Sequence, residues 1–102
     1  MIESGFNDRA RLLGALANEK RLQILRFIAG RETAVGDLAE QVGLSQSALS
    51  QHLAKLKAAN FVTARRQAQT IYYSTEHPGV CRMLKTLEEL GFHPPAEIEE
   101  AC

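Results

Sequence analysis

Residues 44–57 read Leu44-Ser45-Gln46-Ser47-Ala48-Leu49-Ser50-Gln51-His52-Leu53-Ala54-Lys55-Leu56-Lys57. The leucines at 49, 53 and 56 recur at helical spacing, which predicts an amphipathic helix from Gln46 to about Ala59 with these leucines buried. Ser45 can cap the first turn of that helix, and Gly43 can end a short helix around Val35 to Val42. Two helices separated by a tight glycine turn are typical of a helix-turn-helix.

The segments on both sides complete a larger fold. Apolar residues at helical spacing predict three further helices, from Phe6 to Ala17, from Glu19 to about Ala29 and from about Val80 to Leu90. β-Branched and aromatic residues predict two strands, Phe61–Arg65 and Thr70–Ser74, joined by a turn at residues 66–69. The predicted fold is therefore mainly α with a small β-hairpin: a winged helix-turn-helix of five helices plus a two-stranded wing.

The length and composition fit one compact domain. With 102 residues, of which 45% are hydrophobic, the chain is near the lower size at which one core is stable alone. We expect residues 1–92 to form the domain and residues 93–102 to form an acidic C-terminal tail. The first and last helices carry more apolar surface than one small core needs, so we expect a homodimer with an interface of Leu12, Leu13, Leu16, Val80, Met83, Leu84, Leu87 and Leu90. The alternative is that both helices only cover the core of a single chain.

Charge is distributed unevenly along the chain, although its formal net charge is zero. Residues 1–40 balance acids and bases, residues 41–75 contain four bases and no Asp or Glu, and residues 76–102 carry six Glu against two bases. A basic stretch without carboxylates is expected of a face that binds phosphates, so double-stranded DNA is the predicted partner. On charge alone, a merely solvated basic surface is an equal alternative.

The side chains predicted to contact DNA fall into two groups. The helix group contains Ser45, Gln46, Ser47, Ser50, Gln51, His52 and Lys55, and the wing group contains Arg65, Arg66, Gln67 and Gln69. Gln and Ser on the first turns of a helix in the major groove can hydrogen-bond base edges, whereas Lys55 is better placed for phosphates. Arg65 and Arg66 lead into the turn, where one of them can reach a phosphate or a narrow minor groove. His52 can bond either a phosphate or a nearby backbone carbonyl.

These residues resemble a known family. The runs Ala17-Asn18-Glu19-Lys20-Arg21-Leu22, Leu44 to Leu56 and Ala68-Gln69-Thr70-Ile71-Tyr72-Tyr73 look like the ArsR/SmtB family of bacterial winged helix-turn-helix repressors, over about residues 9–92. Within that family, the chain resembles the NolR and HlyU type. The resemblance implies a homodimer held together by the first and last helices. It also implies binding to an imperfect inverted repeat near a promoter, usually with repression.

Many members of that family release DNA when an inducer binds, but this chain departs from their sensor motifs. Ala34-Val35-Gly36-Asp37-Leu38 stands where arsenic and cadmium sensors carry Cys-x-Cys-Asp-Leu. The zinc and nickel ligand positions align with His77, Gly79, Leu90 and His93, and the redox cysteine positions align with Arg26 and Phe92. Two nitrogen ligands do not complete a tetrahedral zinc site, so we predict no metal and no cofactor. Cys81 lies elsewhere and is expected to be a small packing residue.

A sensing alternative stays open, while other classes of protein are disfavoured. The alternative is a ligand- or thiol-responsive repressor switched at the dimer interface, with Cys81 and Cys102 as its thiols. The acid-free stretch disfavours a winged helix used for protein contacts. An enzyme is not expected, because Ser50 and His52 lie two positions apart on a helix and do not face each other. The N-terminus lacks a signal-peptide pattern and no apolar run approaches about 20 residues, so we expect a cytoplasmic protein without membrane contact.

Overall fold

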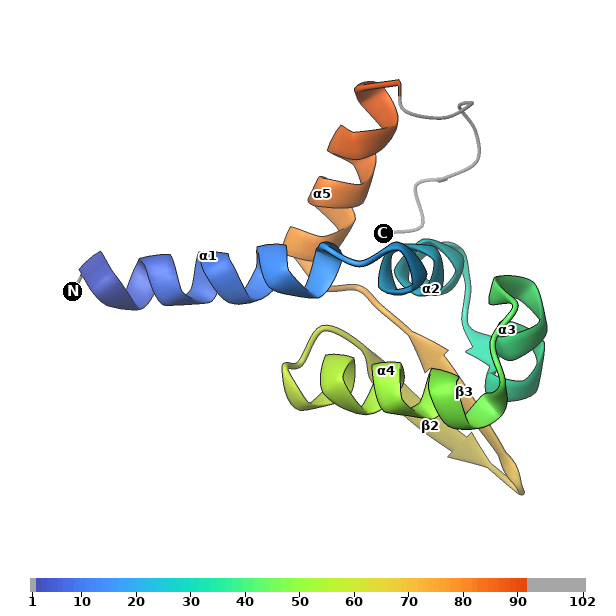
Figure 1. The fold of residues 1–102 in the computed structure, drawn as a ribbon. Coiled ribbons are helices and arrows are strands. Elements are labelled where there is room, and N and C mark those ends of the chain that lie inside the picture. The colour runs from blue at the N-terminus through green and yellow to red at the C-terminus, as the bar shows by residue number, and fades with distance from the viewer. Residues whose placement is uncertain (1, 92–102) are drawn as a thin grey trace.

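Within residues 2–91, the chain forms five helices and three short strands (Figure 1). The structure is a computed structural model that describes these residues, with side chains from residue 5 onward. The elements are α1 (Ile2–Leu16), α2 (Glu19–Gly30), β1 (Thr33–Ala34), α3 (Val35–Val42), α4 (Gln46–Ala58), β2 (Thr63–Gln67), β3 (Thr70–Ser74) and α5 (Pro78–Glu89). All five predicted helices are present, although α1 begins at Ile2 rather than at Phe6. The predicted tail at residues 93–102 lies outside the described part of the chain.

The helix-turn-helix forms where the local sequence predicts it. Gly43 ends α3 in the left-handed conformation, with a φ of 70° that costs a glycine little because it has no Cβ. Ser45 then caps α4, because its Oγ accepts a hydrogen bond from the backbone N–H of Ala48 at 3.1 Å. Asn18 caps α2 in the same way by accepting from the Arg21 N–H at 3.0 Å. Both predicted helix starts are therefore confirmed.

The wing belongs to a three-stranded antiparallel sheet, so the predicted two-stranded hairpin was incomplete. β3 lies in the centre, with β2 on one side and the two-residue β1 on the other. In β1, Thr33 pairs with Tyr73 and Ala34 pairs with Tyr72. A run of two residues is too short to show a strand pattern in the sequence. β1 forms because its backbone hydrogen-bonds to the free edge of β3. The pairing ties the wing to the segment just before α3.

The first strand of the wing begins later than predicted. Phe61 and Val62 are buried in the core, at 6% and 4% exposed, and do not pair in the sheet. The chain reaches them through Asn60, whose φ of 67° is left-handed. The strands are joined by the two residues 68–69, and Ala68 also has a positive φ, of 58°. Phe61 and Val62 therefore anchor the base of the wing to the core.

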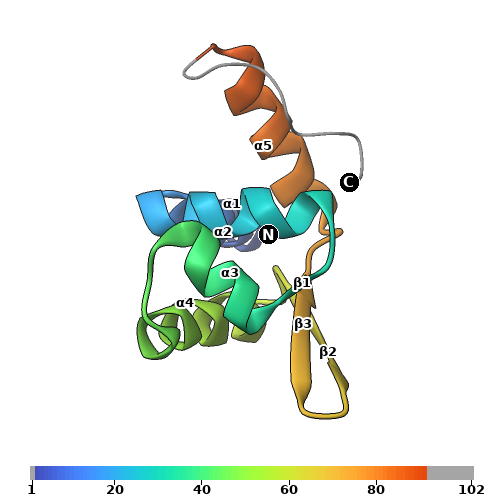
Figure 2. The ribbon, with the colours of Figure 1, turned by 90° about the vertical axis from the view of Figure 1, so that its right-hand side faces the viewer.

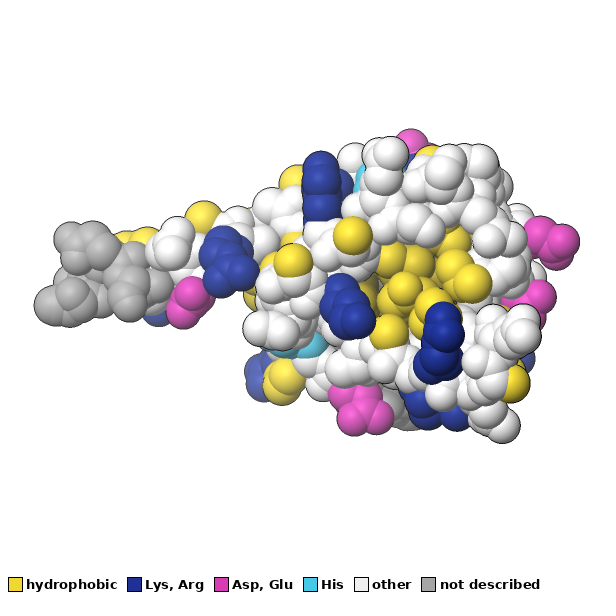
Figure 3. Space-filling view, turned by 90° about the horizontal axis from the view of Figure 1, so that it is seen from below, with side chains coloured by type: hydrophobic (Ala, Val, Ile, Leu, Met, Phe, Trp, Pro, Cys, Tyr) yellow, Lys and Arg dark blue, Asp and Glu magenta, His cyan; other side chains and the backbone are white. Residues whose placement is uncertain are grey.

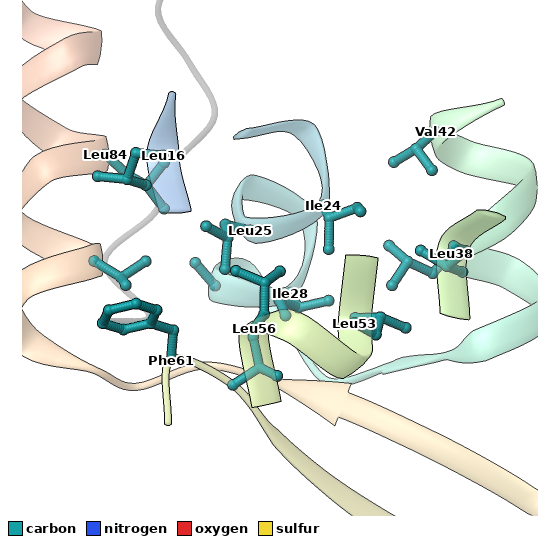
Figure 4. Close-up of a cluster of buried hydrophobic side chains, with 14 of the residues drawn as sticks. Leu16, Ile24, Leu25, Ile28, Leu38, Val42, Leu53, Leu56, Phe61 and Leu84 are labelled. Carbon is teal, nitrogen blue, oxygen red and sulfur yellow. The ribbon is translucent and has the colours of Figure 1, made fainter. Parts of the chain in front are cut away.

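One apolar core joins the helices (Figure 4). Its largest fully buried side chains are Ile24, Leu25, Ile28, Leu38, Leu49, Leu53, Leu56 and Val80. Figure 2 shows the consequence for the arrangement: α4 and the hairpin lie at the same end of the molecule, below α1 and α2. Since the leucines of α4 point into the core, the opposite face of this helix is left to solvent.

α1 and α5 project away from this body (Figure 1). Three residues predicted for the dimer interface, Leu16, Val80 and Leu84, are at most 5% exposed because they pack in the core of their own chain. These three side chains therefore form part of the core of their own chain, and their contact with a second copy stays a prediction. Leu13 and Leu90 are 55% and 60% exposed. No helix described in residues 2–91 has both the length and the apolar character needed to cross a bilayer.

Candidate nucleic-acid interface

The exposed face of α4 carries the polar side chains predicted to read DNA. These exposed side chains are Gln46, Ser47, Ser50 and Gln51, all on the first two turns of the helix. Gly36 of α3 lies beside them, because a Cβ added to this glycine would be 3.9 Å from the Gln46 Nε2. A larger side chain at position 36 would contact Gln46. The glycine therefore leaves the Gln46 amide free to donate and accept hydrogen bonds.

Ser45 has a structural role beside its predicted contact with DNA. Its Oγ accepts the hydrogen bond that caps α4 and lies 3.4 Å from the Ser47 Oγ. A hydroxyl also has a proton to donate, so Ser45 can bond a phosphate while it caps the helix. The positive end of the helix dipole lies at the same place and favours a nearby anion.

Lys20 of α2 holds the end of α3, a role that was not predicted from the sequence. Its Nζ donates to the Val42 carbonyl oxygen at 2.6 Å and to the Gln23 Oε1 at 3.4 Å. The last carbonyls of a helix lack intrahelical partners and carry partial negative charge, so an ammonium group stabilises them. The contact with Val42 joins residues 22 positions apart, which no local pattern reveals. It fixes the turn from which α4 starts.

Arg65 already forms hydrogen bonds within the chain, and a contact with DNA would have to replace some of them. Its guanidinium donates to the two carboxylate oxygens of Glu32 at 2.8 and 2.9 Å, and to the Gln67 Oε1 at 2.8 Å. It also lies over the ring of Tyr72, 4.7 Å from the centroid. The hydrogen bonds from Arg65 lower the pKa of Glu32. A phosphate that approaches Arg65 must therefore compete with a carboxylate from outside the acid-free stretch.

Arg66 is the wing arginine that is available to a phosphate. Neighbouring residues of a strand point to opposite faces, so Arg66 lies on the other face of β2 from Arg65. Its side chain is exposed, and it forms no ion pair with the side chains described between residues 5 and 91. Gln69, in the turn that follows β2, is exposed as well. The structure thus separates two arginines that the sequence places side by side.

The face that carries α4 and the wing is basic (Figure 3). Lys and Arg side chains lie to the left of and below a hollow that contains hydrophobic side chains, and Asp and Glu side chains lie toward the margin of the view. This arrangement agrees with the uneven charge distribution along the sequence. A polyanion can approach the centre of this face without meeting a carboxylate.

His52 lies at the edge of the exposed face of α4 and is half-buried. Partial burial lowers the pKa of its imidazole, and the positive charges of Arg21 and Lys55 lower it further. Among the described residues, no hydrogen bond joins this ring to a backbone carbonyl, the second contact predicted for it. The neutral ring has one N–H group, which can donate a hydrogen bond to a ligand that approaches from solvent.

His77 is used as a helix cap. Its Nδ1 accepts hydrogen bonds from the backbone N–H groups of Gly79 and Val80, at 3.1 and 3.3 Å, at the start of α5. Its ring forms a T-shaped pair with that of Phe61, with 5.0 Å between the centroids and 77° between the planes. No group of three or more potential metal-ligating side chains occurs in the described part of the chain. His93, Phe92 and Cys102 lie outside it, while Cys81 is buried in α5 at 6% exposed.

The chain matches known proteins over most of its length. Residues 18–64 match the family model described as bacterial regulatory protein, arsR family. The chain is 52% identical over 91 residues to the nodulation protein NolR of Rhizobium meliloti. This match covers 89% of the present chain and 75% of NolR. It is 47% identical over 79 residues to the transcriptional activator HlyU of Vibrio cholerae, covering 78% of this chain and 73% of that protein.

Solved structures agree with these sequence matches. HlyU from Vibrio cholerae superposes with a TM-score of 0.83 at 42% identity, over 89% of this chain and 99% of that chain. A homodimeric winged helix-turn-helix DNA-binding domain, Mb0332 of Mycobacterium bovis, superposes with a TM-score of 0.76 at 32% identity, over 93% of each chain. The predicted resemblance and the predicted winged helix-turn-helix are both confirmed.

Proposed function

Because the chain belongs to the arsR family of bacterial regulatory proteins, we propose that it regulates transcription as a homodimer bound to an inverted-repeat operator. A dimer that covers promoter DNA excludes the polymerase from it, so repression is the proposed result. The proposal includes a cytoplasmic location and no enzymatic activity. Double-stranded DNA is the proposed partner.

The exposed Gln and Ser side chains on the first two turns of α4 carry this proposal. Gln46 and Gln51 each present an amide that can pair with adenine in a bidentate manner, and such a pair discriminates against the wrong base by about 1–3 kcal/mol. The core fixes the helix behind these side chains, so they have a defined position when they enter the groove. Arg66 on the wing can reach the phosphate backbone to one side of the helix.

The proposed dimer interface uses the exposed parts of α1 and α5. Its predicted members that stay accessible are Leu12, Leu13, Met83, Leu87 and Leu90, and Phe6 joins them at 59% exposed. Exposed apolar side chains gathered on two projecting helices are typical of a surface that a second copy covers. Homodimerisation of Mb0332, which has the same fold, supports this assembly.

Sedimentation combined with DNA binding tests the proposal. The parent chain should sediment as a dimer, whereas Leu13→Glu should shift it toward the monomer and weaken operator binding, because the charge is desolvated in the interface. Phe27→Glu is the matched control, because Phe27 is an exposed apolar residue of α2 outside the proposed interface. A parent chain that sediments as a monomer and still binds its operator tightly would contradict the proposed assembly.

Transcription in vitro tests the proposed direction of regulation. A promoter that overlaps the operator should give less transcript when the protein is added. More transcript would instead indicate that this chain activates transcription, which is the role stated in the name of its relative HlyU.

A further inference from the structure

Three basic side chains line one groove on the side of α4 that faces α1 and α2. The groove has a volume of about 230 Å³, and its lining residues are Arg11, Gly14, Ala15, Arg21, Lys55, Leu56, Ala59 and Phe61. The bases come from three different helices: Arg11 from α1, Arg21 from α2 and Lys55 from α4. Among the residues that the structure describes, no acidic side chain lines this groove. The tertiary fold alone brings these charges together, because they are far apart in the sequence.

Arg21 is held in a fixed position in this groove. Its Nε donates to the Ala15 carbonyl oxygen at 2.9 Å and its Nη2 donates to that of Gly14 at 3.1 Å. These bonds satisfy carbonyls at the end of α1 and leave the Nη1 group of the guanidinium for another acceptor. Arg21 therefore presents a pre-oriented donor and a positive charge to the groove.

None of the three bases of the groove forms an ion pair with a carboxylate of the described residues. Arg11 and Lys55 are exposed and form no ion pair with the described residues. Asp8, one turn before Arg11 on α1, lines an adjacent groove that Arg11 also lines, and the two side chains form no ion pair there. The charges of Arg21 and Lys55 also reach His52, whose pKa they help to lower. Clustered bases without partners repel each other, and an oxyanion relieves that repulsion.

The groove lies on the opposite flank of α4 from Gln46 and Ser50. At 100° per residue, His52 and Lys55 point to one side of the exposed face, while Gln46 and Ser50 point to the other, toward Gly36. A helix in the major groove of DNA has a phosphate backbone on each side. The wing can contact the phosphate backbone on one side of the helix, and the three bases face the phosphate backbone on the other side.

We propose that Arg11, Arg21 and Lys55 form a phosphate-binding site, with His52 at its edge. Two arginines and a lysine match the oxygens of a phosphate, which accept several charge-assisted hydrogen bonds at once. The phosphate comes either from the DNA backbone flanking the recognition contacts or from a free phosphate in solution. The first source rests on the proposed function, and the second does not.

Paired binding measurements test this site and separate the two sources. Affinity for operator DNA is measured at several salt concentrations for the parent, Arg11→Ala, Lys55→Ala and Arg9→Ala. Arg9 is the matched control, because it lies on the same helix with the same charge but stacks on Phe6, 5.1 Å from its ring centroid. Arg21 is left unchanged because its bonds hold α1. In parallel, inorganic phosphate is titrated into the DNA-free parent and Arg11→Ala at constant ionic strength, with the melting temperature as readout.

Each outcome has a defined meaning. If the site holds backbone phosphate, Arg11→Ala and Lys55→Ala each reduce the slope of log affinity against log salt by about 0.9 per protomer, and Arg9→Ala does not. If it holds free phosphate, the melting temperature of the parent rises saturably and the rise is lost in Arg11→Ala. Unchanged slopes together with no phosphate effect overturn the site. A parent that binds no DNA at all contradicts the proposed function instead, and the phosphate titration then still decides the site.

Discussion

The helix-turn-helix and the wing lie at the same end of the molecule but are held in place by different forces. α4 buries Leu49, Leu53 and Leu56 at 1% exposed or less. In β2, every residue except Ala64 is exposed, and its side-chain contacts lie at the surface: Arg65 pairs with Glu32 and lies over Tyr72, and the Thr63 hydroxyl bonds that of Ser74. Burial of apolar area contributes far more than an exposed ion pair, which salt also screens. The reading helix is thus held by buried apolar contacts, whereas the strands of the wing are held by backbone pairing and surface contacts.

The sharpest test of this contrast removes a buried contact of α4. Leu53→Ala should lower the free energy of unfolding by about 2–5 kcal/mol, because it deletes buried methyl groups and leaves a cavity. Urea unfolding followed by circular dichroism measures the change. Ala54→Ser, at the exposed neighbouring position, should stay within about 0.5 kcal/mol of the parent. Similar losses in both variants would mean that α4 is not held by the core.

A smaller effect is expected at the reading face. Gln46→Ala should lose about 1–3 kcal/mol of discrimination at one base position of each half-site, because its amide is proposed to pair with a base edge. Competition binding with single-base operator variants measures this preference. Uniform weakening on every sequence would instead make Gln46 a contact that only positions the helix.

The cap of α4 is expected to contribute less again. Ser45→Ala should lower the free energy of unfolding by about 1 kcal/mol, because the Ala48 N–H loses its acceptor. Ser47→Ala serves as the control, because Ser47 is exposed on the same turn and caps no backbone group. Chemical unfolding of both variants should separate them, and equal losses would remove the special role of Ser45.

The wing should respond through salt dependence rather than through stability. Arg66→Ala should reduce the salt slope of DNA binding by about 0.9 per protomer, whereas Arg65→Ala should change it less because Arg65 already pairs with Glu32. Glu32→Gln should steepen the slope, since it frees Arg65 for a phosphate. A larger change for Arg65→Ala than for Arg66→Ala would reverse the assigned roles.

The smallest expected effect concerns acid stability. The pKa of His52 is lowered in the folded chain, whereas in the unfolded chain it has its ordinary value of 6.5. As the pH falls, the unfolded chain therefore takes up a proton on His52 before the folded chain does. The free energy of unfolding should therefore fall as the pH drops below about 6.5, and His52→Gln should make that fall shallower. Urea midpoints between pH 7.5 and pH 5.5 measure the difference. Identical pH profiles would show that His52 does not contribute.

The sequence predicts the parts of this molecule that local contacts determine. Gly43 and Ser45 act within a few residues of themselves, so their turn and cap follow from residue type and position. Phe61 and Val62 carry a strand-like composition, yet burial in the core is more favourable for them than pairing. β1 could not be predicted either, because its two residues depend on pairing with β3.

The candidate interface shows the same division between local and distant contacts. The Gln and Ser side chains of α4 follow from helical periodicity. The different states of Arg65 and Arg66 do not, because Glu32 lies 33 residues from Arg65 in sequence. The same holds for the basic groove, whose three side chains come from three helices. Contacts between distant segments are therefore what the structure adds to the sequence.

Selection of binding sites from a random DNA library tests the central proposal most directly. The proposed homodimer should enrich an inverted repeat whose half-sites are about 10 base pairs apart, centre to centre, and Gln46→Ala should relax one position in each half. Enrichment of a single unrepeated site, or of no sequence at all, would contradict a dimer that reads DNA through α4.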